Sequence, residues 1–389
     1  MSSAPIRKMA NVFGVAGVFL RLGATAFGGP ATHIALMEQE VVVRRGWMSR
    51  AEFLEMLDIV NFIPGSNSTE MAIFIGYRRA GWLGLLLGGI CFILPAALIV
   101  SVIAWAYVNF GKLSQTESLF YGIKPVIIAV VVQAMWNLGC TAVKTPLLGI
   151  VGAVAVALGF RVNPLLVLLG AGAFMLIFRA ASQPKGSVAC LTPMLGATSE
   201  FRLLSTAGAV STVSLWPMFL FFLKAGAVMF GSGYVMLAFL RTDLVEHWHW
   251  LTESQLLDAV AVGQFTPGPF LTTATFIGYV LGGSRAALVT TAAIFLPSFV
   301  LVAVSGRLVP RLRQSRLARA FLDGVNVASL ALMAVVTWQL GRTALVDWLT
   351  ISLTVAAAVW LLWYRVNSTW LILGGAALGL SRFVFQTGP

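Results

Sequence analysis

The chain has 389 residues, of which 59% are hydrophobic and 10% are charged, and its mean hydropathy is +0.90. A composition this apolar excludes a soluble globular protein, because too few polar groups remain to cover a surface, and it predicts a protein of the lipid bilayer. The formal net charge is +12. Its arginines fall in short loops between apolar segments, where membrane topology explains them better than nucleic-acid binding does, so no nucleic-acid partner is expected.

Apolar stretches recur along the chain, from residues 11–27 at the start to 370–385 at the end. Several reach the roughly 20 residues that a helix needs to cross about 30 Å of hydrocarbon. Residues 1–29 resemble a signal peptide, but Arg21 interrupts the apolar region and no persuasive cleavage site follows, so this stretch is interpreted as the first membrane segment. The predicted fold is all-α, a polytopic helical membrane protein.

The chain contains two copies of one unit. A shift of 203 residues (222 − 19) superimposes FLRLGATAFGG (19–29) on FLKAGAVMFGS (222–232) and NFIPG (61–65) on QFTPG (264–268). Beyond the Pro-Gly the shift is 202 (276 − 74), and FIGY (74–77) meets FIGY (276–279). The predicted organisation is an N-terminal transporter repeat (1–178), a linker rich in serine and broken by Pro184 and Gly186 (179–214), and a C-terminal transporter repeat (215–389).

The arginines predict how the two halves are oriented. In the first half they flank the Pro-Gly segment, as Arg44, Arg45, Arg50, Arg78 and Arg79, whereas in the second half they gather in the next loop, at 307–319. Because positive loops stay on the cytoplasmic side, this reversal predicts two homologous halves in inverted orientation. Inverted repeats are typical of transporters that work by alternating access.

Each half contains a membrane helix that the sequence interrupts. Residues 54–63 and 66–75, and their counterparts 256–265 and 271–281, are too short to cross a bilayer and surround a Pro-Gly. Matching broken helices are the best sequence pointer to a transporter's substrate site, because the break frees N–H groups at a helix start that favours anions. A small oxyanion is therefore expected at Pro64, Gly65, Ser66, Asn67, Ser68 and Thr69, and at the less polar Pro267 and Gly268. The alternative is a structural kink.

Two further repeated features are candidates for substrate binding. Arg21 aligns with Lys224, and two such intramembrane cations could neutralise a dianion; pairing with Glu55 and its counterpart Asp258 is the equally weighted alternative. The breaks Phe27, Gly28, Gly29 and Pro30, and their counterpart at Gly231, could bring backbone close to a ligand. Tight helix packing is the simpler alternative explanation.

His33 and Glu70 are candidates for carrying coupling protons, with a structural role as the alternative for both. The three histidines show no metal-ligand spacing and no Ser-His arrangement. No metal, cofactor or enzymatic activity is therefore expected, and a membrane enzyme acting on a lipid-borne phosphate is a poorly supported alternative.

The segments FGGPATHIALMEQEVVVRRGWMS, NFIPGSNSTEMAIFIGYRRAGWLG and FILPA closely resemble the chromate ion transporter family in its long, two-domain form. The resemblance implies a multi-pass protein of the bacterial inner (plasma) membrane that exports chromate and confers chromate resistance. It adds Asn61 and Gln264 to the expected binding residues, and directs attention to Glu38 and Arg78 as coupling or gating residues beside His33, Glu55, Glu70 and Asp258. A carrier for sulfate or another tetrahedral oxyanion, and a passive anion channel, remain alternatives, and a homodimer is one option for the oligomeric state.

Overall fold

In the computed structural model, residues 4–111, 114–181, 214–229, 233–364, 366 and 368–387 are described, and these contain helices and no strands. Five of the helices are long and apolar enough to cross a membrane, among them Asn67–Phe110 and Phe270–Ser305. The prediction of an all-α, multi-pass membrane protein is therefore confirmed. Most of the linker, residues 182–213, lies outside the described residues.

The helices of the two halves follow one another in the same order. The first half contains α1(Ala4–Thr25), α2(Pro30–Glu38), η1(Gln39–Arg44), α3(Arg50–Val60), α4(Asn67–Phe110), α5(Ser114–Ala142), α6(Pro146–Gly159) and α7(Pro164–Ala181). The second half contains α8(Leu215–Val228), η2(Gly233–Val235), α9(Met236–Phe239), η3(Leu240–His247), α10(Glu253–Phe265), η4(Phe270–Thr272), α11(Thr273–Gln314), α12(Arg316–Ala344), α13(Trp348–Trp363) and α14(Ser368–Thr387).

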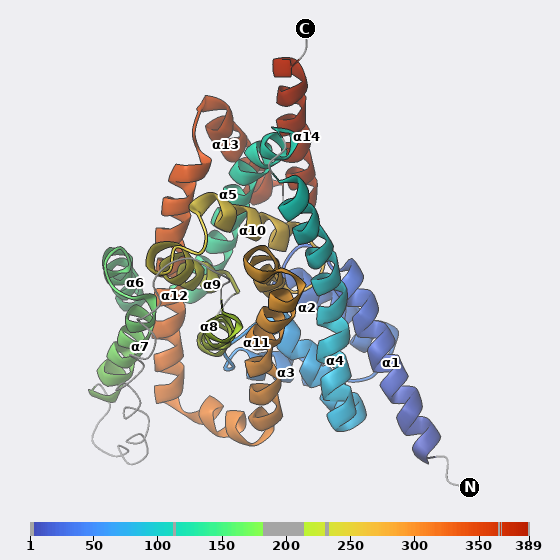
Figure 1. Cartoon of the computed structure of the whole chain (residues 1–389). Helices are drawn as coiled ribbons and strands as arrows, with labels where there is room; N and C mark the ends of the chain where they lie inside the picture. Colours follow the sequence, from blue (N-terminus) through green and yellow to red (C-terminus); the bar gives the residue numbers. More distant parts are fainter. Residues whose placement is uncertain are drawn as a thin grey trace.

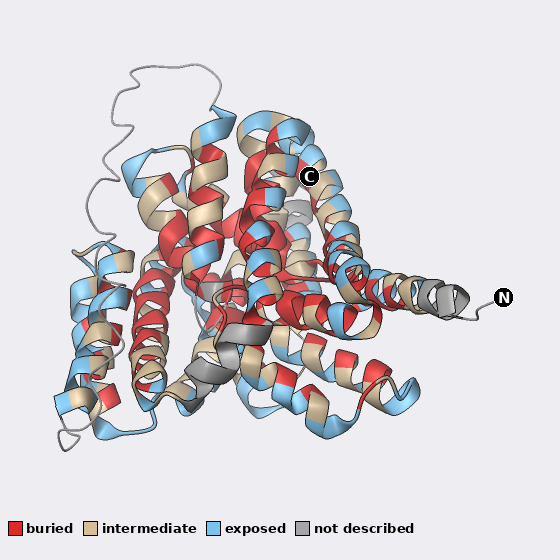
Figure 2. Cartoon of the chain, turned by 90° about the horizontal axis from the view of Figure 1, so that it is seen from below, coloured by how far each residue is buried: buried red, intermediate tan, exposed pale blue. Residues whose placement is uncertain are grey.

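The outer surface of the bundle is apolar. On α4, Leu94, Leu98, Val102 and Trp105 are each between 45% and 65% exposed. Their spacing of three or four residues places them on one face of the helix. Figure 2 shows the buried residues gathered toward the middle of the molecule. An exposed apolar face on a long helix is what lipid contact requires.

The first interrupted segment forms a hairpin with Pro-Gly at its tip. Glu52, at the start of α3, pairs with Arg78 at 3.0 Å, and Asn67 donates to Asn61 at 2.8 Å. The chain therefore runs along α3, turns at residues 61–66, and returns antiparallel to α3 through the first part of α4. That part ends at Gly81, which has a φ of 65° and lies at a kink. The predicted short helices around Pro64-Gly65 are confirmed, with bounds shifted by a few residues.

The long helices α4 and α11 each fold back tightly at their kinks. A Cβ on Gly76 would overlap the Gly84 carbonyl, so the two segments on either side of the α4 kink touch through backbone. In α11 the kink lies at Gly282 and Gly283, and the Thr290 hydroxyl donates to the Ala274 carbonyl at 2.8 Å. The second Pro-Gly thus lies at the tip of an equivalent hairpin, formed by α10, η4 and the start of α11.

The two halves interlock in a reciprocal pattern. Helix α5 packs against α13 and α14 of the second half, and its counterpart α12 packs against α6 and α7 of the first. The long helices α4 and α11 pack against each other, and beyond their kinks they run in opposite directions in Figure 1, where α4 rises from cyan to teal and α11 descends from gold to orange. Each half therefore completes its core with helices from the other.

Candidate substrate site

The two Pro-Gly tips bind reciprocally to the opposite half. The Gly65 N–H donates to the Met229 carbonyl at 2.6 Å, and the Gly268 N–H donates to the Ala26 carbonyl at 2.9 Å. These are equivalent contacts, since Met229 and Gly268 are the repeat partners of Ala26 and Gly65. The N–H groups of the two tip glycines, which sequence analysis expected to be free for an anion, are therefore already satisfied by backbone.

At the start of α4, no described side chain caps the free N–H groups. Ser66 occupies its N-cap position but makes no capping bond, and its hydroxyl instead lies 3.2 Å from that of Ser68. By contrast, α3 and α10 each begin with a complete capping box. Thr69 is fully buried, and its hydroxyl has no partner among the described residues. The first turn of α4 thus gathers donor groups at a buried helix start.

A carboxylate lies beside this tip in the first half only. Glu70 is fully buried and accepts a hydrogen bond from Ser298 of α11 at 3.1 Å, while its Oε2 has no partner among the described residues. The repeat partners of these two residues are Thr272 and Ala96. Thr272 donates to the Pro269 carbonyl at 2.9 Å. The second tip is therefore less polar, as the sequence predicted.

The break between α1 and α2 is confirmed for the first half. Gly28 and Gly29 have φ values of 104° and 84°, which favour glycine, and Pro30 begins α2. His33 lies 3.1 Å from the Ala26 carbonyl through Nε2. Because a carbonyl only accepts, Nε2 carries the hydrogen, and the buried Nδ1 is left without a partner among the described residues. The counterpart Gly231 lies outside the described residues.

The alternative in which the two repeated cations pair with Glu55 and Asp258 is wrong. Arg21 pairs with Glu40 at 2.7 Å, and Lys224 pairs with Asp243 at 3.1 Å. Glu55 is exposed on α3, and Asp258 pairs with Lys124 instead. Glu40 and Asp243 occupy the same position in the two repeats, so the alignment contained the signal that sequence analysis missed.

Glu40 is the centre of a basic cluster. Its buried carboxylate also accepts from Arg45 at 2.8 Å and Arg44 at 3.4 Å. The hydrogen bond from Arg45 lowers the pKa of Glu40 against the opposing effect of burial, and the charges of Arg45 and Arg21 add to the lowering. The guanidinium groups of Arg45 and Arg79 lie 5.5 and 5.2 Å from the ring centre of Trp47. Glu38 pairs with Arg50 at 2.9 Å beside this cluster.

The remaining predicted residues occupy different depths. Those at the tips are mostly buried, namely Gly65, Ser66, Ser68, Thr69, Gln264, Pro267 and Gly268. Those partly exposed are Phe27, Gly29, Pro30, Pro64, Asn67 and Lys224, and those exposed are Arg21, Gly28 and Asn61. The structure thus gathers the first-half polar residues around one tip and keeps Arg21 in a separate ion pair.

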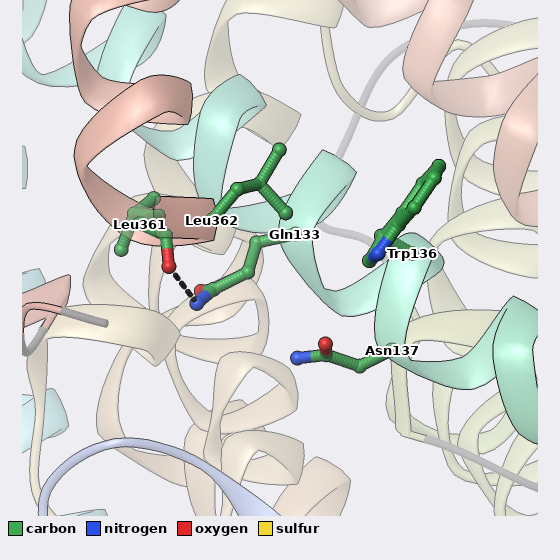
Figure 3. A pocket seen from close by; sticks show the side chains of 5 residues that line it. All are labelled: Gln133, Trp136, Asn137, Leu361 and Leu362. Atoms are coloured by element: carbon green, nitrogen blue, oxygen red, sulfur yellow. Dashed lines mark hydrogen bonds between the residues drawn. The ribbon is translucent and has the colours of Figure 1, made fainter. Parts of the chain in front are cut away.

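Two cavities lie away from the tips. The larger, about 480 Å³, is a lateral pocket between α5 and α13 that is lined by Gln133, Trp136, Asn137, Leu361 and Leu362 (Figure 3). The second, about 350 Å³, lies where α4, α5, α10 and the end of α12 meet. Neither is lined by a residue of the Pro-Gly tips.

Comparisons with known proteins identify relatives along nearly the whole chain. A family model described as "Chromate transporter" matches twice, at residues 13–176 and 216–380. The chain is 33% identical to a "Chromate transport protein" of Cupriavidus metallidurans, over 92% of this chain and 90% of the relative. It is 31% identical to a "Probable chromate transport protein" of Synechococcus elongatus, over 93% of each. No solved structure matches. The chain therefore belongs to the chromate transporter family.

Proposed function

We propose that the protein exports the chromate dianion across the bacterial inner membrane and thereby confers chromate resistance. The relatives named for chromate transport support the substrate. Moving a dianion out of a cell with a negative interior releases about 4.6 kcal/mol per 100 mV, twice the value for one charge. Uptake against the same potential would need about three co-transported protons to reverse the sign of the moved charge. The energetics therefore favour export.

The proposed orientation places the two halves inverted in the membrane. The reversed arginine distribution supports it, as do the opposite directions of α4 and α11 in Figure 1. In this orientation the cluster around Glu40 faces the cytoplasm, where its excess of arginines over carboxylates attracts a dianion toward the protein.

The proposed substrate site is the start of α4. The observation that carries it is the buried Thr69 hydroxyl, which has no hydrogen-bond partner among the described residues and lies in the first turn of a helix whose N-cap residue makes no capping bond. N–H groups, hydroxyls and the positive end of the helix dipole together suit an oxyanion. The tips are closed in this structure, because both are buried and bonded to opposite-half carbonyls. Opening the site requires the Gly65–Met229 contact to separate, which is a conformational step suited to alternating access.

Replacing Thr69 by valine tests the site directly. The hydroxyl makes no hydrogen bond within the described part of the chain, so its loss should leave folding stability nearly unchanged. If it donates to chromate, a hydrogen bond to a charged group worth about 1.5–3 kcal/mol is lost and the KM for chromate rises about tenfold or more. The control is Thr272→Val at the second tip, which removes an equally buried hydroxyl that donates to the Pro269 carbonyl. This control should lower stability and leave the KM for chromate unchanged. An unchanged KM in Thr69→Val removes the site assignment.

The substrate is tested by efflux of labelled chromate from loaded proteoliposomes with sulfate as competitor. Efflux that saturates and resists a large excess of sulfate supports a chromate carrier. Equal competition by sulfate indicates a general oxyanion carrier, and flux without saturation indicates a channel. Asn67→Ala and Arg21→Gln are also expected to abolish export while the protein stays in the membrane. The Asn67–Asn61 bond makes Asn67 part of the tip itself.

A further inference from the structure

The cavity of about 350 Å³ contains a buried ion pair that the proposed anion site does not use. Asp258 of α10 lies 3.1 Å from the ammonium of Lys124 on α5, with side-chain exposures of 6% and 17%. Tyr107 of α4 donates to the same carboxylate at 2.9 Å, and Lys124 also donates to Ser254 at 2.6 Å. Side chains from α4 and α5 thus meet the carboxylate of α10 at the wall of a cavity.

The cavity gives this carboxylate contact with one face of the protein. Its lining includes Gly111, just beyond α4, Thr116 in the first turn of α5, and Val346, just beyond α12. These residues lie at the opposite ends of α4 and α12 from the arginine loops. In the orientation proposed above, the cavity therefore opens to the outside of the cell, where the proton concentration is set by the external medium.

The charges around the cavity do not suit the transported anion. The titratable and charged side chains that line it with Asp258 are Tyr107 of α4 and Glu117, Tyr121 and Lys124 of α5. Beyond Tyr121, Arg382 of α14 pairs with Asp347 at 3.3 Å. Within the lining, two carboxylates face one ammonium, so a cation is favoured over an oxyanion.

We infer that Asp258 and Lys124 form a proton-binding site, occupied from the cavity, that couples proton entry to anion export. The inference rests on the proposed transport function. A proton on Asp258 removes the charge that holds Lys124 and so breaks the ion pair between α10 and α5. Since α10 leads directly to the second Pro-Gly tip, the proton biases the position of that tip. Such a bias requires only that the two conformations differ in proton affinity.

Position in the repeat supports a special role for this pair. Lys124 corresponds to Asn326, and Tyr107 corresponds to Val309, so the first half presents no equivalent cluster around Glu55. The acidic position itself is retained, as Glu55 and Asp258. Sequence analysis named Asp258 as a candidate partner of Lys224 and missed Lys124, because the two lie 134 residues apart (258 − 124).

The test uses the full chain in liposomes with equal labelled chromate on both sides and the membrane potential clamped at zero. Acidifying the outside, within the pH range in which chromate stays a dianion, should drive net outward movement of wild-type chromate although its concentrations start equal. At equal pH labelled chromate exchanges across the membrane without net movement. Asp258→Asn should still exchange chromate, but its pH-driven net movement should be at least tenfold slower than that of wild type. Asp323→Asn, which removes an Asp–Lys pair outside the cavity, should behave as wild type.

Each result decides the inference. Wild-type exchange without pH-driven movement overturns it and leaves chromate transport standing, as does pH-driven movement in Asp258→Asn equal to wild type. Absence of wild-type exchange refutes the transport function and the inference together. If Asp258→Asn also loses exchange, Tyr107→Phe decides. Removing this donor to the carboxylate raises its proton affinity, so the pH of half-maximal movement should shift upward, and an unshifted profile overturns the inference.

Discussion

The two hairpin tips share their backbone contacts and differ in their side chains. Gly65 and Gly268 make equivalent hydrogen bonds to Met229 and Ala26 of the opposite half. Beside Gly65 lies the buried Glu70–Ser298 pair, whereas the equivalent positions beside Gly268 hold a threonine and an alanine. Backbone contacts that survive divergence of the side chains indicate a shared scaffold. Because only the first tip has these polar side chains, the two halves differ in function, and the anion is proposed to bind at the first tip.

The ion pairs of the two halves likewise occupy the same positions, although their charges are not always arranged in the same way. Arg21–Glu40 and Lys224–Asp243 keep both the position and the sign of the charges. Glu38–Arg50 and its counterpart keep the position and exchange the signs, since Arg241 pairs with Glu253 at 2.6 Å. The fold therefore requires the contact, and either arrangement of charge satisfies it.

The largest expected effect comes from adding a side chain at the first tip. In Gly65→Ala the new Cβ would overlap Glu70 Oε1 and lie 2.7 Å from the Ser298 hydroxyl, at a φ of 140°. We expect a loss of about 2–5 kcal/mol in the free energy of unfolding, from backbone strain and overpacking together, and loss of chromate export. Thermal unfolding in detergent and vesicle efflux measure the two effects.

Gly81→Ala is the matched control for that variant. Gly81 also has a positive φ, of 65°, but no atom lies within 4 Å of the added Cβ. We expect only the backbone cost of about 1–2 kcal/mol, with export retained. Equal effects of the two substitutions would show that strain, and not the crowding at the tip, controls the first hairpin.

The next effect compares the two repeated ion pairs. Glu40→Gln leaves three arginines with a neutral partner, and we expect it to destabilise by about 1–3 kcal/mol, discounted for the partial exposure of the arginines. Asp243→Asn affects one lysine, and about 0–1 kcal/mol is expected. Because its pKa is lowered by folding, Glu40 stabilises above its unfolded pKa and loses this contribution as the pH falls through the folded value. The difference between wild type and Glu40→Gln should therefore shrink in acid, which unfolding measured across pH checks.

The sequence predicted the tips well because they depend on local chain properties. Pro-Gly stops a helix wherever it occurs, and its repetition identified both hairpins before any contact was known. The partners of the charged residues were harder, because pairing depends on the rotation of each helix about its axis. The alignment shows a shared acidic position at Glu40 and Asp243 as well as at Glu55 and Asp258, and only the three-dimensional structure shows that Arg21 faces Glu40. The Asp258–Lys124 pair joins the two halves, and no pattern within one repeat indicates it.

A smaller effect tests whether the exchanged ion pair is interchangeable. Glu38→Arg places two arginines together and should destabilise by about 0.5–1 kcal/mol, since both side chains are partly exposed. The double variant Glu38→Arg with Arg50→Glu reproduces the second-half arrangement and should return to within about 0.5 kcal/mol of wild type. A double-mutant cycle measured by thermal unfolding gives the coupling. Additive losses in the double variant would mean that the sign of each charge matters to its surroundings.

The smallest effect concerns the caps of α6 and α13, which begin at equivalent positions with different chemistry. Thr145 accepts from the Leu148 N–H, and Asp347 accepts from the Thr350 N–H. The hydrogen bond from Tyr121, followed by that from Thr350, lowers the pKa of Asp347 to about 2. A carboxylate with a lowered pKa stabilises the fold above its unfolded pKa of about 3.9, and this contribution is lost as the pH falls from about 4 to about 2. Asp347→Thr copies the first-half cap, which does not titrate, but it removes the acceptor of Tyr121 and the partner of Arg382. The variant should therefore be slightly less stable than wild type near neutral pH, and the difference should shrink as the pH falls through this range. An acid profile identical to wild type would show that the Asp347 cap contributes nothing to stability, and that the two caps are equivalent despite their chemistry.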